Sequence, residues 1–239
     1  MRARTAGFVA GAAIVQMLVV ASHAEATPLV TNGGFETQSP QVAVNTCSSY
    51  SAASTGITGW TVVGPGFVAV CSTGFVQGGV SFTTGDASSY WLDLTGISSN
   101  LLDGVQQTVA TNAGDSYTLS FLVGNVNNTN AQGFDFGTTS TVNVSANGVS
   151  LGAFTNSCTS CTSTLQWQQF STTFVASSSS TILKFLNGDP GADNSNGLDN
   201  VVLIDNGPVS SPAVPEPASL VLLATGLAMG VRSWRKRHS

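Results

Sequence analysis

Carboxylates are the side chains of this sequence that offer the most chemistry. Residues 27–206 contain ten Asp and Glu residues, whereas Lys184 is the only Lys or Arg in the same range. Both histidines, His23 and His238, lie outside it. Without histidine, this region cannot use Ser-His-Asp or Cys-His catalysis, and it cannot form a His-ligated zinc site. The chemistry that remains is binding of a hard cation by oxygen, or action of a carboxylate pair on a glycan.

The acidic balance also limits the partners of this region. Ten acidic residues and one basic residue give residues 27–206 a net charge of −9. Nucleic acids and anionic lipid surfaces are bound by clustered Lys and Arg, so we exclude both as partners of the domain. The charge suits calcium or neutral glycans.

Aromatic and amide side chains are candidates for a sugar-binding surface, because sugars stack on rings and hydrogen-bond to amides. The candidates are Tyr50, Tyr90, Asn125, Asn127 and Asn128. The three asparagines belong to the Asn-rich segment 125–133, which Phe134 and Phe136 follow. The tryptophans Trp60, Trp91 and Trp167 lie within strand-like runs, and we predict that they belong to the core.

Two further groups of acids have simpler interpretations. Asp93 and Asp103 are available as a hydrolytic pair, but the sequence gives no separation between them, and Asp93 in Trp-Leu-Asp-Leu is predicted to be a buried acceptor. We therefore predict no catalytic residue and no enzyme. The acidic segment 189–197 lacks the order and the final Glu of an EF-hand loop, so it is predicted to be a solvated turn rather than a calcium site.

Four cysteines complete the inventory, and an even number in an exported chain favours disulfides. Three pairings remain open from sequence. Proximity along the chain favours Cys47–Cys71 and Cys158–Cys161. The second pair is a C-x-x-C without a second such motif or a following helix pattern, so we predict a loop disulfide rather than a redox or zinc site.

Short strands must position these residues. The region is rich in Ser, Thr, Gly, Val and Asn, which favours strands joined by turns over long helices. Asn147-Gly148 is typical of a two-residue hairpin turn leading into residues 149–154. Eight to ten strands in about 180 residues indicate a single β-sandwich over residues 27–206. The predicted strands are Trp60–Val63, Gly66–Val70, Ser89–Leu94, Gly104–Ala110, Ser116–Val123, Ser140–Ala146, Gln168–Ala176, Thr181–Leu186 and Leu198–Ile204.

The N-terminus has the pattern of a secretory signal peptide. Arg2 and Arg4 precede a mostly apolar run over residues 6–21, and Ala24-Glu25-Ala26 is a small-x-small cleavage site. We predict removal of residues 1–26.

The C-terminus, after a linker over residues 207–214, reads as a sorting signal. Its sorting motif consists of Pro215, Glu216, Pro217 and the later basic residues Arg232, Arg235, Lys236 and Arg237. Between them, residues 218–231 form an apolar run of 14 residues, which as a helix covers only about 21 Å of a bilayer core of about 30 Å. The basic cluster keeps this end in the cytoplasm and the domain outside. Residues 215–239 resemble the PEP-CTERM signal of Gram-negative bacteria, which implies processing by an exosortase and a final place at the cell surface or in the matrix.

A second resemblance covers the domain itself. The order of its motifs resembles choice-of-anchor C and DUF642 proteins, which implies a galactose-binding-like jelly roll. In such domains an N-terminal Glu and a C-terminal Asp often share one calcium; the matching residues are Glu36 and Asp199, with Asn32 as a further ligand. The motifs are Asn32-Gly33-Gly34-Phe35-Glu36, Gly59-Trp60, Trp91-Leu92-Asp93-Leu94, Gly104-Val105-Gln106-Gln107 and Gly197-Leu198-Asp199-Asn200-Val201.

These observations predict an exported, non-catalytic β-sandwich that associates with exopolysaccharide or a cell-wall glycan. Before processing, the C-terminal span anchors it transiently in the inner membrane. A structural matrix protein without a specific ligand is the alternative, and a carboxylate-dependent glycan hydrolase is a weaker one.

Overall fold

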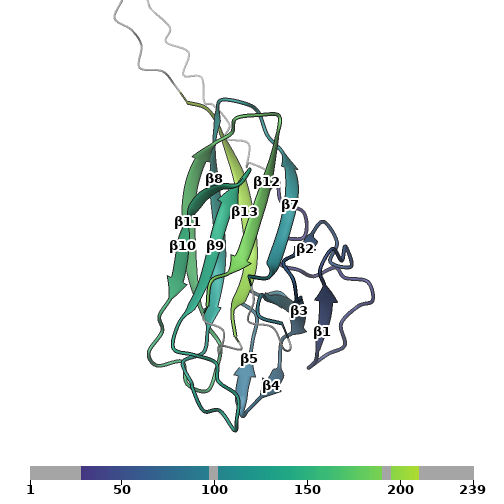
Figure 1. The fold of residues 1–239 in the computed structure, drawn as a ribbon, viewed down its shortest axis with the longest axis vertical. Coiled ribbons are helices and arrows are strands. Elements are labelled where there is room, and N and C mark those ends of the chain that lie inside the picture. The colour runs from purple at the N-terminus through teal and green to yellow at the C-terminus, as the bar shows by residue number, and fades with distance from the viewer. Residues whose placement is uncertain (1–27, 97–101, 190–194, 210–239) are drawn as a thin grey trace, which may run out of the picture.

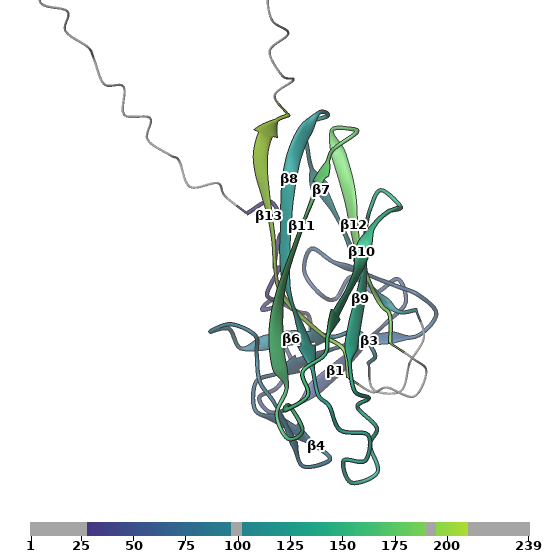
Figure 2. The same cartoon turned by 90° about the vertical axis from the view of Figure 1, so that its left-hand side faces the viewer.

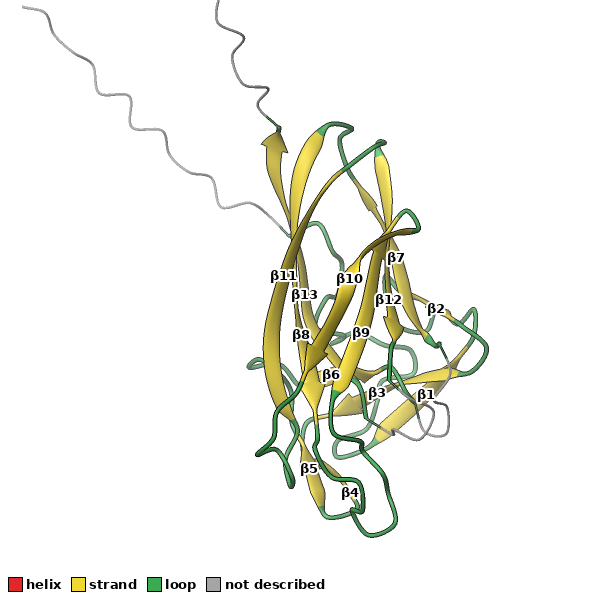
Figure 3. Ribbon diagram, turned by 60° about the vertical axis from the view of Figure 1, so that its left-hand side comes forward, coloured by secondary structure: helices red, strands yellow, loops and turns green. Residues whose placement is uncertain are grey.

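The computed structural model describes residues 28–96, 102–189 and 195–209. The predicted signal peptide over residues 1–26 and the predicted sorting signal over residues 215–239 lie outside these ranges. Strands are the regular elements of the described chain (Figure 3), and within it no helix has the length and hydropathy to cross a membrane. The strands are β1 Cys47–Ser51, β2 Thr61–Val63, β3 Phe67–Ser72, β4 Phe75–Gln77, β5 Val80–Phe82, β6 Tyr90–Asp93, β7 Gly104–Ala110, β8 Asp115–Asn125, β9 Ser140–Ala146, β10 Val149–Asn156, β11 Gln166–Val175, β12 Ser180–Asn187 and β13 Gly197–Pro208.

Two antiparallel sheets form a β-sandwich. One sheet has six strands in the order β1-β3-β6-β13-β8-β11, and the other has five in the order β10-β9-β12-β7-β2. The two layers lie face to face in Figure 2. Strands β4 and β5 form a separate hairpin at one end of the molecule (Figure 1).

The main core fills the space between the sheets. Along β9 the side chains of Ser140, Val142, Val144 and Ala146 are buried and the intervening ones are half-buried. This alternation follows from the pleat, which sends successive side chains to opposite faces of a strand. On β8 the same alternation begins at Tyr117 and buries every second residue as far as Val123. The predicted sandwich is therefore confirmed at the level of its two layers.

The outer face of the six-stranded sheet is covered as well. Ala69 of β3 and Trp91 of β6 point away from the main core and belong to a second hydrophobic cluster with Phe82 of β5 and Phe136. Their neighbours in the strands, such as Leu92, belong to the main core. Because β3 and β6 are buried on both faces, a polar residue on their outer face is held in a fixed, nearly dry environment.

The strand predictions are confirmed for most of the sandwich. The bounds of β7 and β9 coincide with those predicted, and Asn147 and Gly148 turn the β9–β10 hairpin with φ values of 48° and 80°. Trp60 and Trp91 are buried as predicted, at 1% exposure each. The strands β1, β4 and β5 were not predicted.

Candidate functional site

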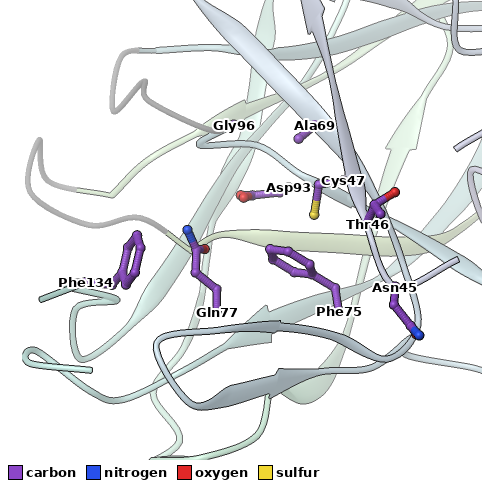
Figure 4. A pocket seen from close by; sticks show the side chains of 9 residues that line it. All are labelled: Asn45, Thr46, Cys47, Ala69, Phe75, Gln77, Asp93, Gly96 and Phe134. Carbon is purple, nitrogen blue, oxygen red and sulfur yellow. The ribbon is translucent and has the colours of Figure 1, made fainter. Parts of the chain in front are cut away.

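A pocket of about 310 Å³ opens beside the β4–β5 hairpin. Figure 4 shows the side chains of Phe134, Gln77 and Phe75 in a row along it, with the Asp93 carboxylate farther in. The lining comes from five separate parts of the chain: the residues before and at the start of β1, strand β3, the hairpin strand β4, the end of β6 with the turn after it, and the loop after β8. The lining residues are Asn45, Thr46, Cys47, Ala69, Phe75, Gln77, Asp93, Gly96 and Phe134.

Packed rings hold the aromatic walls in place. Phe134 stacks on Phe136 with ring centroids 6.1 Å apart, and Phe75 contacts Phe82 at 5.6 Å. Phe82 in turn stacks on Trp91 at 5.7 Å. Phe134 remains 38% exposed despite these contacts. The pocket therefore presents an open ring face whose position is fixed from behind.

Two amide side chains at the pocket are available to a ligand. Neither the Asn45 nor the Gln77 side chain donates or accepts a hydrogen bond within the described residues. Thr46 donates its hydroxyl to the Ala43 carbonyl at 2.7 Å, which leaves the lone pairs of that oxygen free to accept. The pocket thus combines aromatic rings with unused amide donors and acceptors, and it has no Lys or Arg.

Asp93, the last residue of β6, is the ionisable group of the pocket. Its Oδ1 accepts hydrogen bonds from the backbone N of Thr95 at 3.0 Å, from the Thr95 hydroxyl at 2.7 Å and from the backbone N of Asn196 at 3.4 Å. Burial raises the pKa of Asp93 to about 7, and these hydrogen bonds only partly oppose that rise. The prediction of a buried acceptor at Asp93 is confirmed.

The predicted glycan-binding tyrosines are used by the fold instead. Tyr50 is 6% exposed and donates its hydroxyl to the Pro40 carbonyl at 3.3 Å. Tyr90 packs against the main core and donates to the Val42 carbonyl at 3.0 Å. Both rings hold the segment before β1 against the sheet, so they do not form the open sugar-stacking surface that was predicted.

The predicted asparagines are likewise used by the fold. Asn125 is fully buried, and its amide accepts from the Ser140 hydroxyl at 3.1 Å. Asn127 donates to the Cys158 carbonyl at 3.2 Å, and Asn128 donates to the Thr162 carbonyl at 2.9 Å. Their amides stitch the loop after β8 to the loop after β10, which corrects the prediction that they face a ligand.

The N-terminal turn docks on a bulge in β13, and this contact brings the predicted calcium residues toward each other. The backbone N of Val201 donates to the Gly33 carbonyl at 2.9 Å. A Cβ on Gly33 would lie 2.0 Å from the Val201 carbonyl oxygen, so only glycine allows this approach. A Cβ on the next residue, Gly34, would lie 3.8 Å from Asp199 Oδ1 and 3.9 Å from Glu36 Cγ.

Asp199 and Glu36 at this turn are suitable ligands for a hard cation, although both also accept backbone hydrogen bonds. Asp199 is fully buried and accepts from the backbone N of Gly85 at 2.8 Å. Burial raises its pKa to about 7, with further repulsion from Asp86 and Glu36. Glu36 accepts from the backbone N of Tyr90 at 2.7 Å. Within the described residues, no three His, Cys, Asp or Glu side chains lie close enough together to bind a metal ion. A calcium ion at this turn would therefore take Glu36, Asp199 and backbone carbonyls as ligands.

The Asn32 side chain is not positioned as the calcium ligand that was predicted. Its Nδ2 donates to the carbonyls of Thr37 and Thr58 at 3.0 Å each, and its Oδ1 accepts from the backbone N of Thr37 at 3.0 Å. These bonds close the N-terminal turn. The side chain therefore shapes the turn that carries Glu36 rather than contacting the carboxylates.

Only one of the two predicted disulfides is formed. Cys47 and Cys71 are directly opposite each other in β1 and β3 and are bonded. Cys158 and Cys161 are free thiols: Cys161 Sγ donates to the Cys158 carbonyl at 3.0 Å. The C-x-x-C turn is thus closed by a thiol–carbonyl contact, and the second predicted pairing is wrong in this structure.

Two further predictions concerned the acids Asp103 and the segment 189–197. Asp103 is fully buried and accepts from the backbone N of Gly66 at 2.7 Å. It does not line the pocket that contains Asp93, so the structure does not bring these two acids into one pocket. Of segment 189–197, predicted to be a solvated turn, residues 190–194 lie outside the described ranges. Ser195 and Asn196 are fully buried, which corrects the prediction for these two residues.

Sequence reasoning missed the residues that line the pocket, although one signal was present. Gly78-Gly79 lies between Phe75–Gln77 and Val80–Phe82, with φ values of 58° and 75°. Two adjacent glycines between short strand-like runs indicate a two-residue hairpin. Asn45, Thr46 and the unused Gln77 carried no signal, because their role depends on contacts between distant segments.

Solved structures with the same fold include two cyclases. A cyclase from Fischerella sp. TAU in complex with 4-(1H-indol-3-yl)butan-2-one has 18% identity and a TM-score of 0.54, and the match covers 78% of this chain and 100% of that one. The Stig cyclase FisC from the same source, in complex with (3Z)-3-(1-methyl-2-pyrrolidinylidene)-3H-indole, has 17% identity and a TM-score of 0.51, with 77% and 100% coverage. At this identity the likeness concerns the fold alone.

A family 35 carbohydrate-binding module from an environmental isolate is a more distant match. It has 16% identity and a TM-score of 0.38, and the match covers 60% of this chain and 93% of that one. A search of curated proteins found no match.

Two sequence families match the chain in adjacent regions. Residues 213–237 match the PEP-CTERM protein-sorting motif, so the chain is an exported protein that is sorted to the cell surface and processed by an exosortase. Residues 28–204 match the family described as a protein of unknown function, DUF642. The chain therefore belongs to the DUF642 family and ends in a PEP-CTERM sorting motif.

Proposed function

We propose that this protein is a non-catalytic, glycan-binding component of the cell surface or extracellular matrix. Its sandwich is of the jelly-roll type, and its site is the pocket between Phe75, Phe134 and Gln77. The partner is the exopolysaccharide or a cell-wall glycan of the producing cell. The observation that carries the proposal is the combination of an open ring face with amides that make no other hydrogen bond.

The composition of the pocket suits a neutral sugar. The apolar face of a sugar ring stacks on Phe134, while Asn45 and Gln77 offer both donors and acceptors to its hydroxyls. A cationic side chain, which an anionic ligand needs, does not line the pocket. At about 310 Å³ it lies at the lower end of ligand pockets, so it takes the end of a glycan rather than a long stretch.

The position of the pocket agrees with a sorted surface protein. Gly197, at the start of β13, pairs with Asp93, whereas Pro208, at its end, pairs with Asp115. These ends of β13 are separated by 11 residues, or roughly 36 Å of strand. The described chain therefore ends on the side of β13 opposite the pocket, and the sorting motif follows in sequence after that end.

A single acid in the pocket favours binding over hydrolysis. Glycoside hydrolysis uses two carboxyl groups on either side of the scissile bond. Asp93 is the only carboxyl among the lining residues. Calcium at Glu36 and Asp199 belongs to the proposal as a structural ion that holds the N-terminal turn on β13.

The test is binding of the full chain, solubilised in mild detergent, to a glycan array that includes exopolysaccharide of the producing strain. We expect saturable binding that Phe134→Ala weakens about fivefold, because a ring contact contributes about 1 kcal/mol. Val149→Ala is the matched control, since Val149 is an exposed apolar side chain, 68% accessible, on β10 and does not line the pocket. Equal loss in both variants, or no saturable binding, overturns the proposal and favours a structural matrix protein.

A further inference from the structure

The end of the sandwich beneath the pocket contains a buried polar cluster, which we call the Asn196 cluster. It consists of Asp93 at the end of β6, Asn187 and Asp189 at the end of β12, Thr141 on β9, and Asn196 just before β13. Asn187 and Asn196 are 1% and 0% exposed. Polar groups at this depth need partners, because an unsatisfied buried group costs free energy.

Asn196 connects the two carboxylates of the cluster. Its backbone N donates to Asp93 Oδ1 at 3.4 Å, and its Nδ2 donates to the Thr141 carbonyl at 2.6 Å. The backbone N of the same Thr141 donates to Asp189 Oδ1 at 2.5 Å. Asn187 Oδ1 accepts from Asn196 Nδ2 at 2.7 Å and from the backbone N of Asp189 at 3.0 Å. Asn196 therefore contacts Asp93 directly through its backbone N and is linked to Asp189 through Thr141 and Asn187.

Two oxygens in the cluster have no partner. Asp189 Oδ2 and Asn196 Oδ1 are buried and accept no hydrogen bond. The amide of Asn196 cannot be turned to relieve this, because both of its N–H groups are used by Thr141 and Asn187. Burial raises the pKa of Asp189 to about 7, and repulsion by Asp93 adds to the rise. The two oxygens thus lack a hydrogen-bond donor or a cation.

We infer that the Asn196 cluster binds a divalent cation, Ca²⁺ by preference, through Asp93, Asp189 and the side-chain oxygen of Asn196. Carboxylate and amide oxygens are the ligands of Ca²⁺, and backbone carbonyls and water complete its six to eight positions. The pocket gives the ion a path from solvent, because Asp93 lines it. The site is distinct from Glu36–Asp199, since the Asp199 carboxylate accepts from the backbone N of Gly85 and of Asn200 and makes no hydrogen bond to a residue of the cluster.

Such an ion has a structural consequence for the pocket. It joins the last residue of β6 to the chain after β12 and to the start of β13, across both sheets. The floor of the pocket is then fixed by a bound ion. This inference does not rest on glycan binding, because an ion at the cluster is expected whether or not the pocket takes a sugar.

The test counts Ca²⁺ ions on the full chain by native mass spectrometry after dialysis against Ca²⁺. Asp189→Asn removes one ligand charge and keeps an oxygen for the Thr141 N–H; we expect it to lose one ion per chain. Asp115→Asn is the matched control, because it removes the same charge far from the cluster. Asp115 is the first residue of β8, roughly 33 Å of strand from Asn125 at the other end. We expect no change in its ion count.

Two further variants distinguish loss of the ion at the Asn196 cluster from loss of an ion at Glu36–Asp199. Asp93→Asn should lose the same ion as Asp189→Asn, with circular dichroism used to verify that the sheets are retained. Asp199→Asn leaves the cluster intact, so it should still carry one ion. The inference is overturned if Asp199→Asn carries no ion, a result that needs no cluster variant to fold, or if folded Asp93→Asn and Asp189→Asn bind as many ions as the unmodified chain.

Discussion

Amide side chains at this site are distinguished by their hydrogen bonds rather than by their type. Asn125 and Asn128 were predicted to bind sugar, but their amides are used by Ser140 and Thr162. Asn45 and Gln77, which no sequence pattern marked, make no such bonds within the described chain. Sequence gives the side chains that are suited to a sugar. Whether an amide is free depends on which distant segment reaches it, and that information is present only in the folded chain.

Gly33 is the point at which the N-terminal turn contacts β13. Gly33→Ala places a methyl group 2.0 Å from the Val201 carbonyl oxygen, so the N-terminal turn must move off β13. We expect a loss of about 1–3 kcal/mol in the free energy of unfolding, as for other overpacked sites. Urea denaturation followed by tryptophan fluorescence measures it.

The neighbouring glycine is the control. A Cβ on Gly34 would meet no atom closer than 3.8 Å, so Gly34→Ala should change stability by less than about 0.5 kcal/mol. If the two variants are equally stable, the turn does not dock on β13 as described.

Strands were predictable where their sequences alternate over several residues. β7 and β9 each span seven residues, and their apolar residues mark the main core on one face. β1 has the sequence Cys-Ser-Ser-Tyr-Ser, and β4 and β5 have three residues each, too few for a period to show. The predicted strands form most of the sandwich, and two of them, β3 and β6, supply Ala69 and Asp93 to the pocket. The remaining lining residues lie on or beside the missed strands β1 and β4 or in loops. The fold class was therefore predictable and the site was not.

The Cys47–Cys71 disulfide tests the role of β1. Its removal by Cys47→Ala with Cys71→Ala opens a loop with a sequence separation of 24, which should cost about 3 kcal/mol of unfolding free energy. Because Asn45, Thr46 and Cys47 line the pocket, we expect glycan affinity to fall with it. Scanning calorimetry measures the change in unfolding free energy, and titration calorimetry measures the change in glycan affinity.

The free thiols provide a contrast for this experiment. Cys158 is half-buried and forms no disulfide, so Cys158→Ser should leave both the melting temperature and glycan binding unchanged. An equal loss of stability on its substitution would mean that Cys158 also forms a bond, against the structure.

Three buried carboxyl groups make the stability of the whole molecule depend on pH. Burial raises the pKa of Asp93, Asp189 and Asp199 from 3.8 to about 7. Between these values the folded carboxyls keep their protons while the unfolded ones ionise. The folded state then binds more protons than the unfolded state, so its stability falls as pH rises from about 4 to about 7.

This sign gives a prediction for the metal-free protein. In chelator, the melting temperature should be higher at about pH 5 than at about pH 7.5, the reverse of a protein whose acids are stabilised by salt bridges. Added Ca²⁺ should raise the value at the higher pH and narrow the difference, because it replaces the protons as counter-charge. Scanning calorimetry shows the effect, and a melting temperature that rises with pH in chelator contradicts it.

A crystal structure of the full chain with a bound fragment of the producing strain's exopolysaccharide is the decisive measurement on the pocket. We expect a sugar ring stacked on Phe134, with its hydroxyls bonded to Asn45 and Gln77 and the bound end turned toward Asp93. A fragment bound elsewhere, for instance along the exposed edge strand β11, with an empty pocket would contradict it.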